Sequence, residues 1–297
     1  MTADRGRVGL VIHGGVEVQR NRSNGRELNY MRLLIRAGRD RLNAGARALD
    51  VVVETLQAME ASGLYPAGAG AWPDNEGRYE LDGALADGAG ERAGGVWALS
   101  GFKSPILAAR VVLDARPNYL LYRKRADELA REAGLETIDT PAVWYAGGAR
   151  AADPTPGSIG CIALDARGAL AAGSSTTGQL TKMLPLDSGE LQVPAAMLHA
   201  DDQIAVACAC YGVGGAERFL RASATARIAR RFRESDDSLE IIAANALAQA
   251  GVMGGVGGLI AMSARGDIVM PYLSAGMRRA ALYPNGRMVA AVFQEHA

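Results

Sequence analysis

The sequence predicts an α/β fold in which β-sheets stack on one another and helices cover their outer faces. Strand-like apolar runs gather near both ends of the 297-residue chain, and helical periodicity dominates between them. This order differs from the regular strand–helix alternation of a parallel sheet. Apolar residues make up 49% of the chain, which is enough for a sizeable core. We therefore expect stacked sheets with outer helical layers.

The first half begins with a buried strand and continues into helices. Val52, Leu56 and Met59 repeat at helical spacing, and Ser104 followed by proline is typical of a helix start. The expected elements are a strand at 7–15, helical structure from Glu27 to Ser62, strands at 77–82 and 94–99, a helix at 104–114, a strand at 118–122 and a charged helix at 124–134.

Residues 135–157 lose periodicity and collect Gly, Pro, Ala and Asp, as expected for a linker. The expected elements after it are strands at 158–164, 169–176 and 203–210, a basic helix at 217–233, a helix at 239–250 and strands at 256–262, 267–272 and 288–293. Neither half alone has enough strands to close a core. The chain is therefore interpreted as one domain, 1–297.

Charge and composition exclude several classes of function. Thirty-two basic residues balance 32 acidic ones, so we expect neither a nucleic-acid nor a membrane-surface partner. The N-terminus lacks the apolar run of a signal peptide, and no segment is long enough to span a membrane. Cys208 and Cys210 lie on one face of a strand, and with Cys161 they are interpreted as reduced core thiols of a cytoplasmic protein.

The stretch P-T-P-G-S-I-G-C-I-A-L-D, residues 154–165, raises a catalytic possibility. Two strands flank the turn that runs from Asp165 to Gly168, which predicts a hairpin. Ser158 then lies opposite Ser175 or Thr176, and a bulge at Gly168 decides which. A freed α-amine on Ser158 could act as base for its own hydroxyl, and a neighbouring hydroxyl could orient that amine or bind an oxyanion. The alternative is a pair of half-polar strands with ordinary serines.

Several segments, taken in order, resemble the plant-type asparaginases or isoaspartyl peptidases, with glycosylasparaginase a more distant relative. They are V-I-H-G-G, A-L-D-V-V-V-E-T-L, Y-P-A-G-A-G, Y-E-L-D-G-A-L-A-D-G, K-S-P-I-L-A-A-R, G-S-I-G-C-I-A-L-D-A-R-G-A-L-A-A-G-S-S-T-T-G, G-G-V-G-G-L-I-A-M and P-Y-L-S-A-G-M-R-R-A. The resemblance implies a four-layer αββα sandwich of the N-terminal-nucleophile hydrolase type. It also implies self-cleavage between Gly157 and Ser158, giving segments 1–157 and 158–297.

The same resemblance assigns roles to individual residues. Ser158 occupies the nucleophile position, where the family normally has threonine, and Thr176 matches the threonine that supports it. Tyr211 and Gly212 lie where the family has its oxyanion Thr-Gly pair, although Ala209 is an alternative for the threonine. The resemblance further implies a sodium ion held by backbone carbonyls near residues 61–70, no required cofactor, and a homodimer of αβ units.

Departures from the family pattern concern the substrate. With a one-residue shift, Asp187 replaces the arginine that binds the substrate α-carboxylate, and Glu190 replaces the aspartate that binds its α-amine. Without the shift, these positions fall on Leu186 and Gly189. A carboxylate in place of a guanidinium would repel a free carboxylate and favour a cationic or carboxyl-blocked substrate.

Two further family positions differ, because Pro66 and Ser104 each stand where the family has Asn. The expected activity is hydrolysis of a non-standard β-aspartyl-like or other small-molecule or peptide amide. Rival interpretations are an acyl or amide transferase on the same fold, and an uncut, non-catalytic binding protein. His13 is interpreted as a structural histidine that bonds a loop, and no residues have zinc-ligand spacing.

Overall fold

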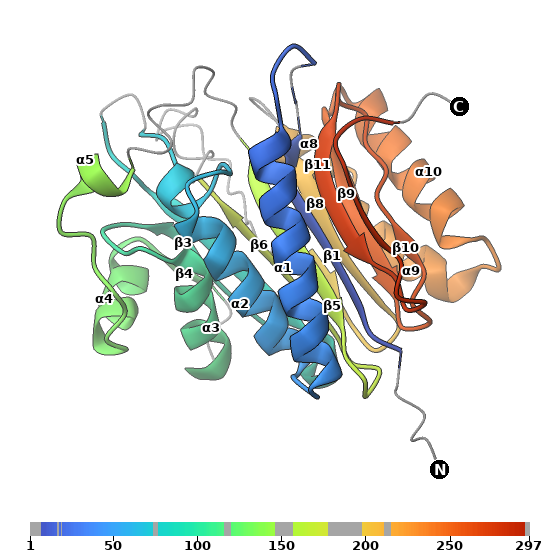
Figure 1. Cartoon of the computed structure of the whole chain (residues 1–297), viewed down its shortest axis with the longest axis horizontal. Helices are drawn as coiled ribbons and strands as arrows, with labels where there is room; N and C mark the ends of the chain where they lie inside the picture. The colour runs from blue at the N-terminus through green and yellow to red at the C-terminus, as the bar shows by residue number, and fades with distance from the viewer. Residues whose placement is uncertain are drawn as a thin grey trace.

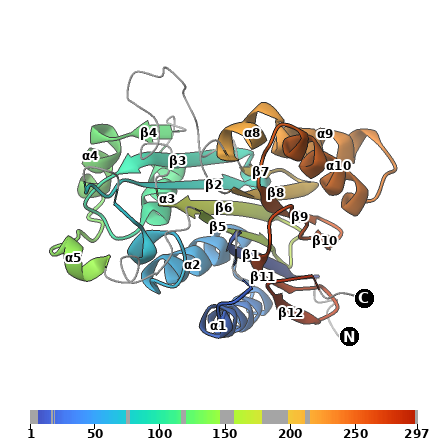
Figure 2. The same ribbon diagram turned by 90° about the horizontal axis from the view of Figure 1, so that it is seen from above.

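The computed structural model describes residues 7–16, 18, 20–73, 77–115, 120–145, 157–177, 198–210 and 215–294. Within these ranges, one mixed sheet has eight strands and a second, antiparallel sheet has four. Figures 1 and 2 show helices on the outer side of each sheet. The chain is therefore a mixed α/β protein, as the sequence predicts.

The larger sheet carries the predicted hairpin near its centre. In spatial order its strands are β12 (Met288–Ala291), β11 (Met277–Leu282), β1 (Gly9–Val16), β5 (Ser158–Leu164), β6 (Leu170–Thr176), β2 (Leu81–Asp87), β3 (Arg92–Leu99) and β4 (Leu120–Tyr122). The β3–β4 pair is parallel, and the other neighbours are antiparallel.

The smaller sheet lies against the inner face of the larger one. In spatial order its strands are β10 (Ile268–Val269), β9 (Gly257–Ser263), β8 (Ile204–Cys210) and β7 (Leu198–Ala200). Strands β5 and β8 contact each other, and alanines and branched apolar residues of both sheets form one shared core. Cys208 and Cys210 both belong to the core on the other face of β8, as the strand periodicity predicts. All three cysteines are buried and none of them forms a disulfide bond.

Helices complete the two outer sides. On the larger sheet are α1 (Gly25–Asn43), α2 (Ala48–Ala61) and α3 (Pro105–Ala115), and on the smaller sheet are α8 (Gly215–Arg221), α9 (Ala224–Glu234) and α10 (Leu239–Val252). The remaining short elements are η1 (Gly68–Gly70), η2 (Gly88–Gly90), α4 (Lys124–Glu132) and α5 (Pro141–Trp144). No helix in the described ranges is both long and apolar enough to cross a membrane.

Several predicted boundaries need correction. The strand predicted at 77–82 runs instead from Leu81 to Asp87, because the fully buried residues begin at Leu81. The basic helix predicted at 217–233 is two helices, since Ser223 adopts a left-handed conformation with φ of 50° and ends the first. The described start of the predicted linker is packed against the domain: Ile138 donates its amide to Gly101, and buried Tyr145 stacks on Tyr79.

Candidate active site

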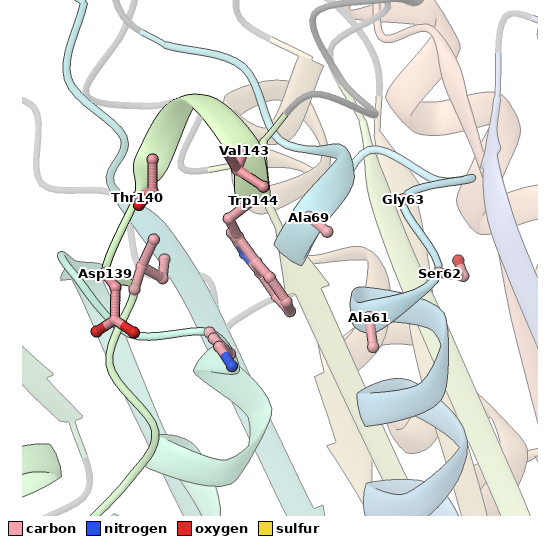
Figure 3. Close-up of a pocket in the computed structure, with 10 residues that line it drawn as sticks. Ala61, Ser62, Gly63, Ala69, Asp139, Thr140, Val143 and Trp144 are labelled. Carbon is pink, nitrogen blue, oxygen red and sulfur yellow. The ribbon is translucent and has the colours of Figure 1, made fainter.

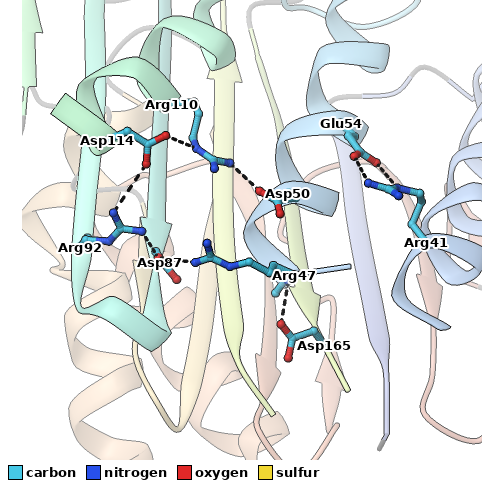
Figure 4. A network of polar contacts seen from close by, with 10 residues as sticks. Arg41, Arg47, Asp50, Glu54, Asp87, Arg92, Arg110, Asp114 and Asp165 are labelled. Carbon is cyan, nitrogen blue, oxygen red and sulfur yellow. Dashed lines mark hydrogen bonds and ion pairs between the residues drawn. The ribbon is translucent and has the colours of Figure 1, made fainter. Parts of the chain in front are cut away.

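The hairpin of β5 and β6 is anchored firmly at its turn. Asp165 accepts the Ala48 amide at 3.0 Å, which ties the turn to the first residue of α2, and it also accepts the Arg167 and Ala169 amides. Figure 4 shows this aspartate beside a network in which Arg47 and Arg92 both reach Asp87. The turn end of the hairpin is thus held by α2, and the other end carries Ser158.

The turn also settles which hydroxyl faces Ser158. The Asp165 amide donates to the Ala169 carbonyl at 3.0 Å, so three residues form the loop, and Gly168 has a left-handed φ of 81°. This is the three-residue hairpin loop with glycine at its last position. The resulting register places Ser158 opposite Thr176, and Ser175 opposite Ile159. Of the two alternatives left open by the sequence, the structure selects Thr176.

Ser158 points toward the interior between the two sheets. Ile159 belongs to the core beneath α2, whereas Ile162 belongs to the core between the sheets. Because side chains alternate along a strand, Ser158 lies on the same side as Ile162. Gly157 is buried and Ser158 is only 8% exposed, so the predicted cleavage bond lies in a protected position.

Gly15, near the end of β1, lies beside Ser158. Gly15 has a left-handed φ of 95°, and a Cβ atom there would lie 3.6 Å from the Ser158 carbonyl oxygen. It would also lie 3.4 Å from Cγ of Pro66, so Pro66 and Ser158 flank the same glycine. Pro66, which stands where the resemblance implies an asparagine, is therefore close to the candidate nucleophile.

His13 lies on the inner face of the sheet next to Gly160, its partner in the ladder of β1 and β5. It is fully buried, and neither ring nitrogen has a hydrogen-bond partner among the described residues. The prediction that it bonds a loop is wrong for the described residues, because the ring lies against the backbone of Gly160, where a Cβ atom would be 2.2 Å from Nε2. Burial lowers the pKa of His13 to about 3, so the ring is neutral.

Asp82 occupies the strand position next to Thr176 on its other side. The ladders place Asp82 opposite Thr176 and Thr176 opposite Ser158, so the three residues form one row across β2, β6 and β5. Asp82 is 1% exposed and accepts the Ala98 amide at 2.8 Å. Ala98 has a left-handed φ of 56°, which is rare for alanine, and the contact holds the irregularity between β2 and β3.

A pocket of about 420 Å³ lies outside the loop that follows α2. Figure 3 shows Trp144 facing Ala61 and Ala69 across it, with Asp139 and Thr140 at one side. The loop that the resemblance connects with sodium forms one wall of this pocket. The carbonyls of Tyr65, Ala67 and Gly68 accept amides within the loop, and each keeps a second lone pair for a cation. Across the described ranges, His, Cys, Asp and Glu form no group of three suited to a metal ion.

The remaining candidate residues fall largely outside the described ranges. Tyr211 and Gly212 lie there, and so do the substrate-binding candidates Leu186, Asp187, Gly189 and Glu190. Ala209, the alternative to Tyr211, is buried on β8 in the core between the sheets. Gly257 allows close approach of β8, since a Cβ there would lie 2.5 Å from the Ala209 carbonyl oxygen.

Sequence reasoning missed one buried acid behind the hairpin. Glu60 is 1% exposed and accepts the Ile106 amide at 3.1 Å and the Ser104 hydroxyl. Its position could have been found from the helical repeat, because residue 60 follows Val52 and Leu56 at steps of four on the buried face of α2.

Comparison with known proteins gives consistent matches over nearly the whole chain. A family model described as asparaginase matches residues 6–146 and 145–291. The isoaspartyl peptidase of Salmonella typhimurium strain LT2 is 32% identical, over 96% of this chain and 98% of its own. That of Escherichia coli K12 is 31% identical over 98% and 97%, and the plant-type L-asparaginase of Pyrobaculum calidifontis is 30% identical over 91% and 95%.

Proposed function

The chain belongs to the asparaginase family of amidohydrolases, and we propose that it is a self-cleaving N-terminal-nucleophile enzyme with Ser158 as nucleophile. The observation that carries this proposal is the register of the hairpin. A serine that directly follows a buried glycine opens β5, and the hydroxyl residue Thr176 lies directly opposite it. The finer architecture proposed with it is the four-layer αββα sandwich, in one domain matured to segments 1–157 and 158–297.

Self-cleavage would free the amine that later turnover needs. The Ser158 hydroxyl attacks the Gly157 carbonyl carbon, a C–O bond forms, the Gly157–Ser158 C–N bond breaks, and the hydroxyl proton moves to the Ser158 nitrogen. Water then hydrolyses the resulting ester. The products are a carboxylate on Gly157 and a free α-amine and restored hydroxyl on Ser158.

Turnover would use the same hydroxyl on a substrate amide. The α-amine of Ser158 takes the hydroxyl proton as Oγ attacks the amide carbonyl, and it returns the proton to the leaving amine. Thr176 and the backbone amides near Tyr211 and Gly212 hold the oxyanion. Water then releases the acyl group from Ser158.

The substrate we propose carries a cationic group or a blocked carboxyl near a β-aspartyl-like or other amide. Asp187 and Glu190 supply two acids where the family pattern has an arginine and an aspartate. Two carboxylates attract a cation and repel a free α-carboxylate. The substrate is thus a small-molecule or peptide amide, and simple β-aspartyl dipeptides are poor substrates.

The assembly that we expect is the one that the family resemblance implies, and the expected location follows from the reduced cysteines. We propose a cytoplasmic homodimer of αβ units that needs no cofactor for the reaction. A sodium ion would be bound by carbonyls of the loop near residues 61–70, where it would rigidify the segment that carries Pro66. No reaction step depends on that ion.

The test measures the intact mass of freshly purified protein over days. Ser158→Ala is measured in parallel as the matched variant. We expect the wild-type chain to split into two pieces that meet at Gly157 and Ser158, and the variant to stay whole. A wild-type chain that remains whole under all conditions would contradict the proposal and favour a non-catalytic binding protein.

Substrate class is tested on the cleaved protein with pairs of amides that differ only in a free or blocked carboxyl. Faster hydrolysis of the blocked member, reversed in Asp187→Arg, is the expected result. Mixed amine acceptors are included in the same assay. Preferential formation of the coupled product over the hydrolysis product would instead identify a transferase.

A further inference from the structure

Helix α10 has an uncharged surface on the side that faces away from the smaller sheet. The residues that it buries in the core are Leu239, Ile242, Ala243, Ala246, Leu247 and Ala250. The exposed residues on its opposite face, which we call the α10 stripe, are Ile241, Ala244, Asn245, Ala248 and Val252. Figures 1 and 2 show α10 in the outer helical layer. Its stripe therefore faces outward from the described chain.

The α10 stripe is unusual for a surface helix. Such a helix normally places charged residues on its outer face. The neighbouring α9 follows this rule, because Arg227, Arg230 and Glu234 are exposed on it. The α10 stripe has no charged member, and its residues Ile241 and Val252 are 51% and 83% exposed. An exposed face of this composition is typical of an interface with another protein surface.

Two further apolar side chains enlarge the stripe near its C-terminal end. Met253 follows Val252 and is 39% exposed, and Leu273 is 48% exposed. Leu273 lies against α10, because a Cβ at Gly251 would be 2.7 Å from its Cδ1. Together with Ile241, these residues make up four of the eight large hydrophobic side chains that are exposed in the described ranges. Half of the exposed apolar side chains thus gather on one surface.

The α10 stripe is complementary to itself. Ile241 and Val252 stand at its two ends, and Ala244 and Ala248 lie between them. If a second α10 packs antiparallel about a two-fold axis, Ile241 of each copy lies against Val252 of the partner subunit. The small alanines between them allow the two helices to approach closely. Each apolar end of the stripe therefore meets the other end of an identical stripe.

The charges at the two ends of α10 match in the same arrangement. Glu240 is exposed at the start of the helix. Arg218 lies just beyond its other end, where a Cβ at Gly254 would be 3.6 Å from Arg218 Nε. Glu240 and Gly254 are about four helical turns apart, so they lie on the same flank of the helix. Antiparallel pairing therefore brings Glu240 of each copy to the end that carries Arg218 of the partner subunit, which attracts the copies twice.

We propose that the α10 stripe, extended by Met253 and Leu273, is the surface through which two copies of this chain form a two-fold symmetric dimer. The inference rests on the proposed function in one respect, since that proposal includes a homodimer. The occupant is a second copy of the chain, because the apolar ends and the charged ends of this surface each complement their own counterparts.

The dimer dissociation constant is measured by sedimentation over a dilution series. Val252→Lys places an ammonium group opposite Ile241 and near Arg218, so we expect the constant to rise about 100-fold. Leu33→Lys is the matched control, because Leu33 is 56% exposed on α1, which covers the other sheet. It should leave the constant unchanged. A constant that is the same for Val252→Lys and the wild type would overturn the proposal, and so would a wild type that is monomeric throughout.

Cross-linking tests the antiparallel arrangement. Ile241→Cys, Val252→Cys and the double variant are each treated with a short bifunctional maleimide. In the proposed dimer the two different positions meet, whereas like positions are separated by roughly 16 Å along the helix axis. Cys161, Cys208 and Cys210 are buried and do not compete. We expect covalent dimers from the double variant alone. Covalent dimers from either single variant, or none from the double variant, would overturn the proposal.

The outcome for this interface is separable from the outcome for the catalytic proposal, because assembly and chain cleavage are measured independently. Ser158→Ala, which should stay whole, is included in the dilution series with and without Val252→Lys. A dimer weakened by Val252→Lys in a chain that never cleaves would preserve the interface and overturn the proposed function. Cleavage at Ser158 in a protein whose dimer constant ignores Val252→Lys would overturn the interface and preserve the proposed function.

Discussion

Ser158 lies directly opposite Thr176 in the antiparallel ladder of β5 and β6. Directly opposite residues bring their Cβ atoms to roughly 4.5–5.5 Å, so the two hydroxyls are within reach of each other. The same threonine lies opposite Asp82 in the ladder of β6 and β2. The Thr176 hydroxyl can both donate and accept a hydrogen bond, and it therefore lies between the buried acid Asp82 and the candidate nucleophile Ser158.

Thr176→Val should slow self-cleavage and amide hydrolysis by about 100-fold, because it removes one hydroxyl that supports the developing charge. Thr176→Ser keeps the hydroxyl and is the matched control, which should stay within a few-fold of the wild type. Cleavage rates from intact mass and turnover of a blocked amide substrate measure both effects. Equal rates for the valine and serine variants would show that the Thr176 hydroxyl has no part in either reaction.

The hairpin could be predicted from the sequence, but its register could not. Asp165 and Gly168 mark a turn between two apolar runs, which is a strong local signal. The register depends on the backbone conformation of Gly168 and on the bond from Asp165 to Ala169, and glycine permits more than one arrangement. The choice between Ser175 and Thr176 therefore needed three-dimensional structure.

Strand β11 was missed for a different reason. Its sequence begins M-R-R, and two adjacent arginines argue against an internal strand. The structure satisfies Arg279 with the carbonyls of Met277, Val292 and Phe293, and Arg278 with the Asn24 side chain. These partners come from distant parts of the chain, so no local pattern shows them. The buried position of Glu60 follows from the helical repeat of α2, but its donors come from the start of α3, and no local pattern shows them.

Glu60 should make the folded protein less stable as pH rises. Its pKa is raised from the ordinary 4.5 to about 7, so between these values the folded state binds more protons than the unfolded state. Stability is lost over that window, by about 3 kcal/mol for a shift of this size. The unfolding free energy of Glu60→Gln minus that of the wild type should grow by this amount from pH 4.5 to 7.

Urea denaturation in the Ser158→Ala background measures this difference on one uncut chain. Glu54→Gln should show none of it, because Glu54 is exposed and pairs with Arg41 at the surface. A difference that shrinks with rising pH would contradict the assignment.

His13 should make the folded protein less stable as pH falls, which is opposite to the effect of Glu60. Burial lowers its pKa from 6.5 to about 3, so between these values the folded state binds fewer protons than the unfolded state. Its contribution to stability is therefore present above pH 6.5 and is lost as pH falls toward 3, by on the order of 4–5 kcal/mol. His13→Leu should remove this acid sensitivity and leave stability at pH 7 little changed, because the ring makes no hydrogen bond to the described residues. Urea denaturation at pH 7 and 4.5 measures it, and equal acid sensitivity in the variant and the wild type would contradict the prediction.

Gly160→Ala tests whether the contact of His13 with Gly160 determines the packing between the sheets. A Cβ at residue 160 would lie 2.2 Å from Nε2 of His13, so the ring must move within a closed core. The expected cost is about 1–3 kcal/mol of unfolding free energy. Gly25→Ala is the control, because the nearest atom to its new Cβ is Ser23 Oγ at 3.6 Å. Adding His13→Ala to Gly160→Ala should restore part of the loss by removing the clashing ring. If the double variant loses more unfolding free energy than the two single variants lose together, the ring and the new methyl group do not compete for the same space.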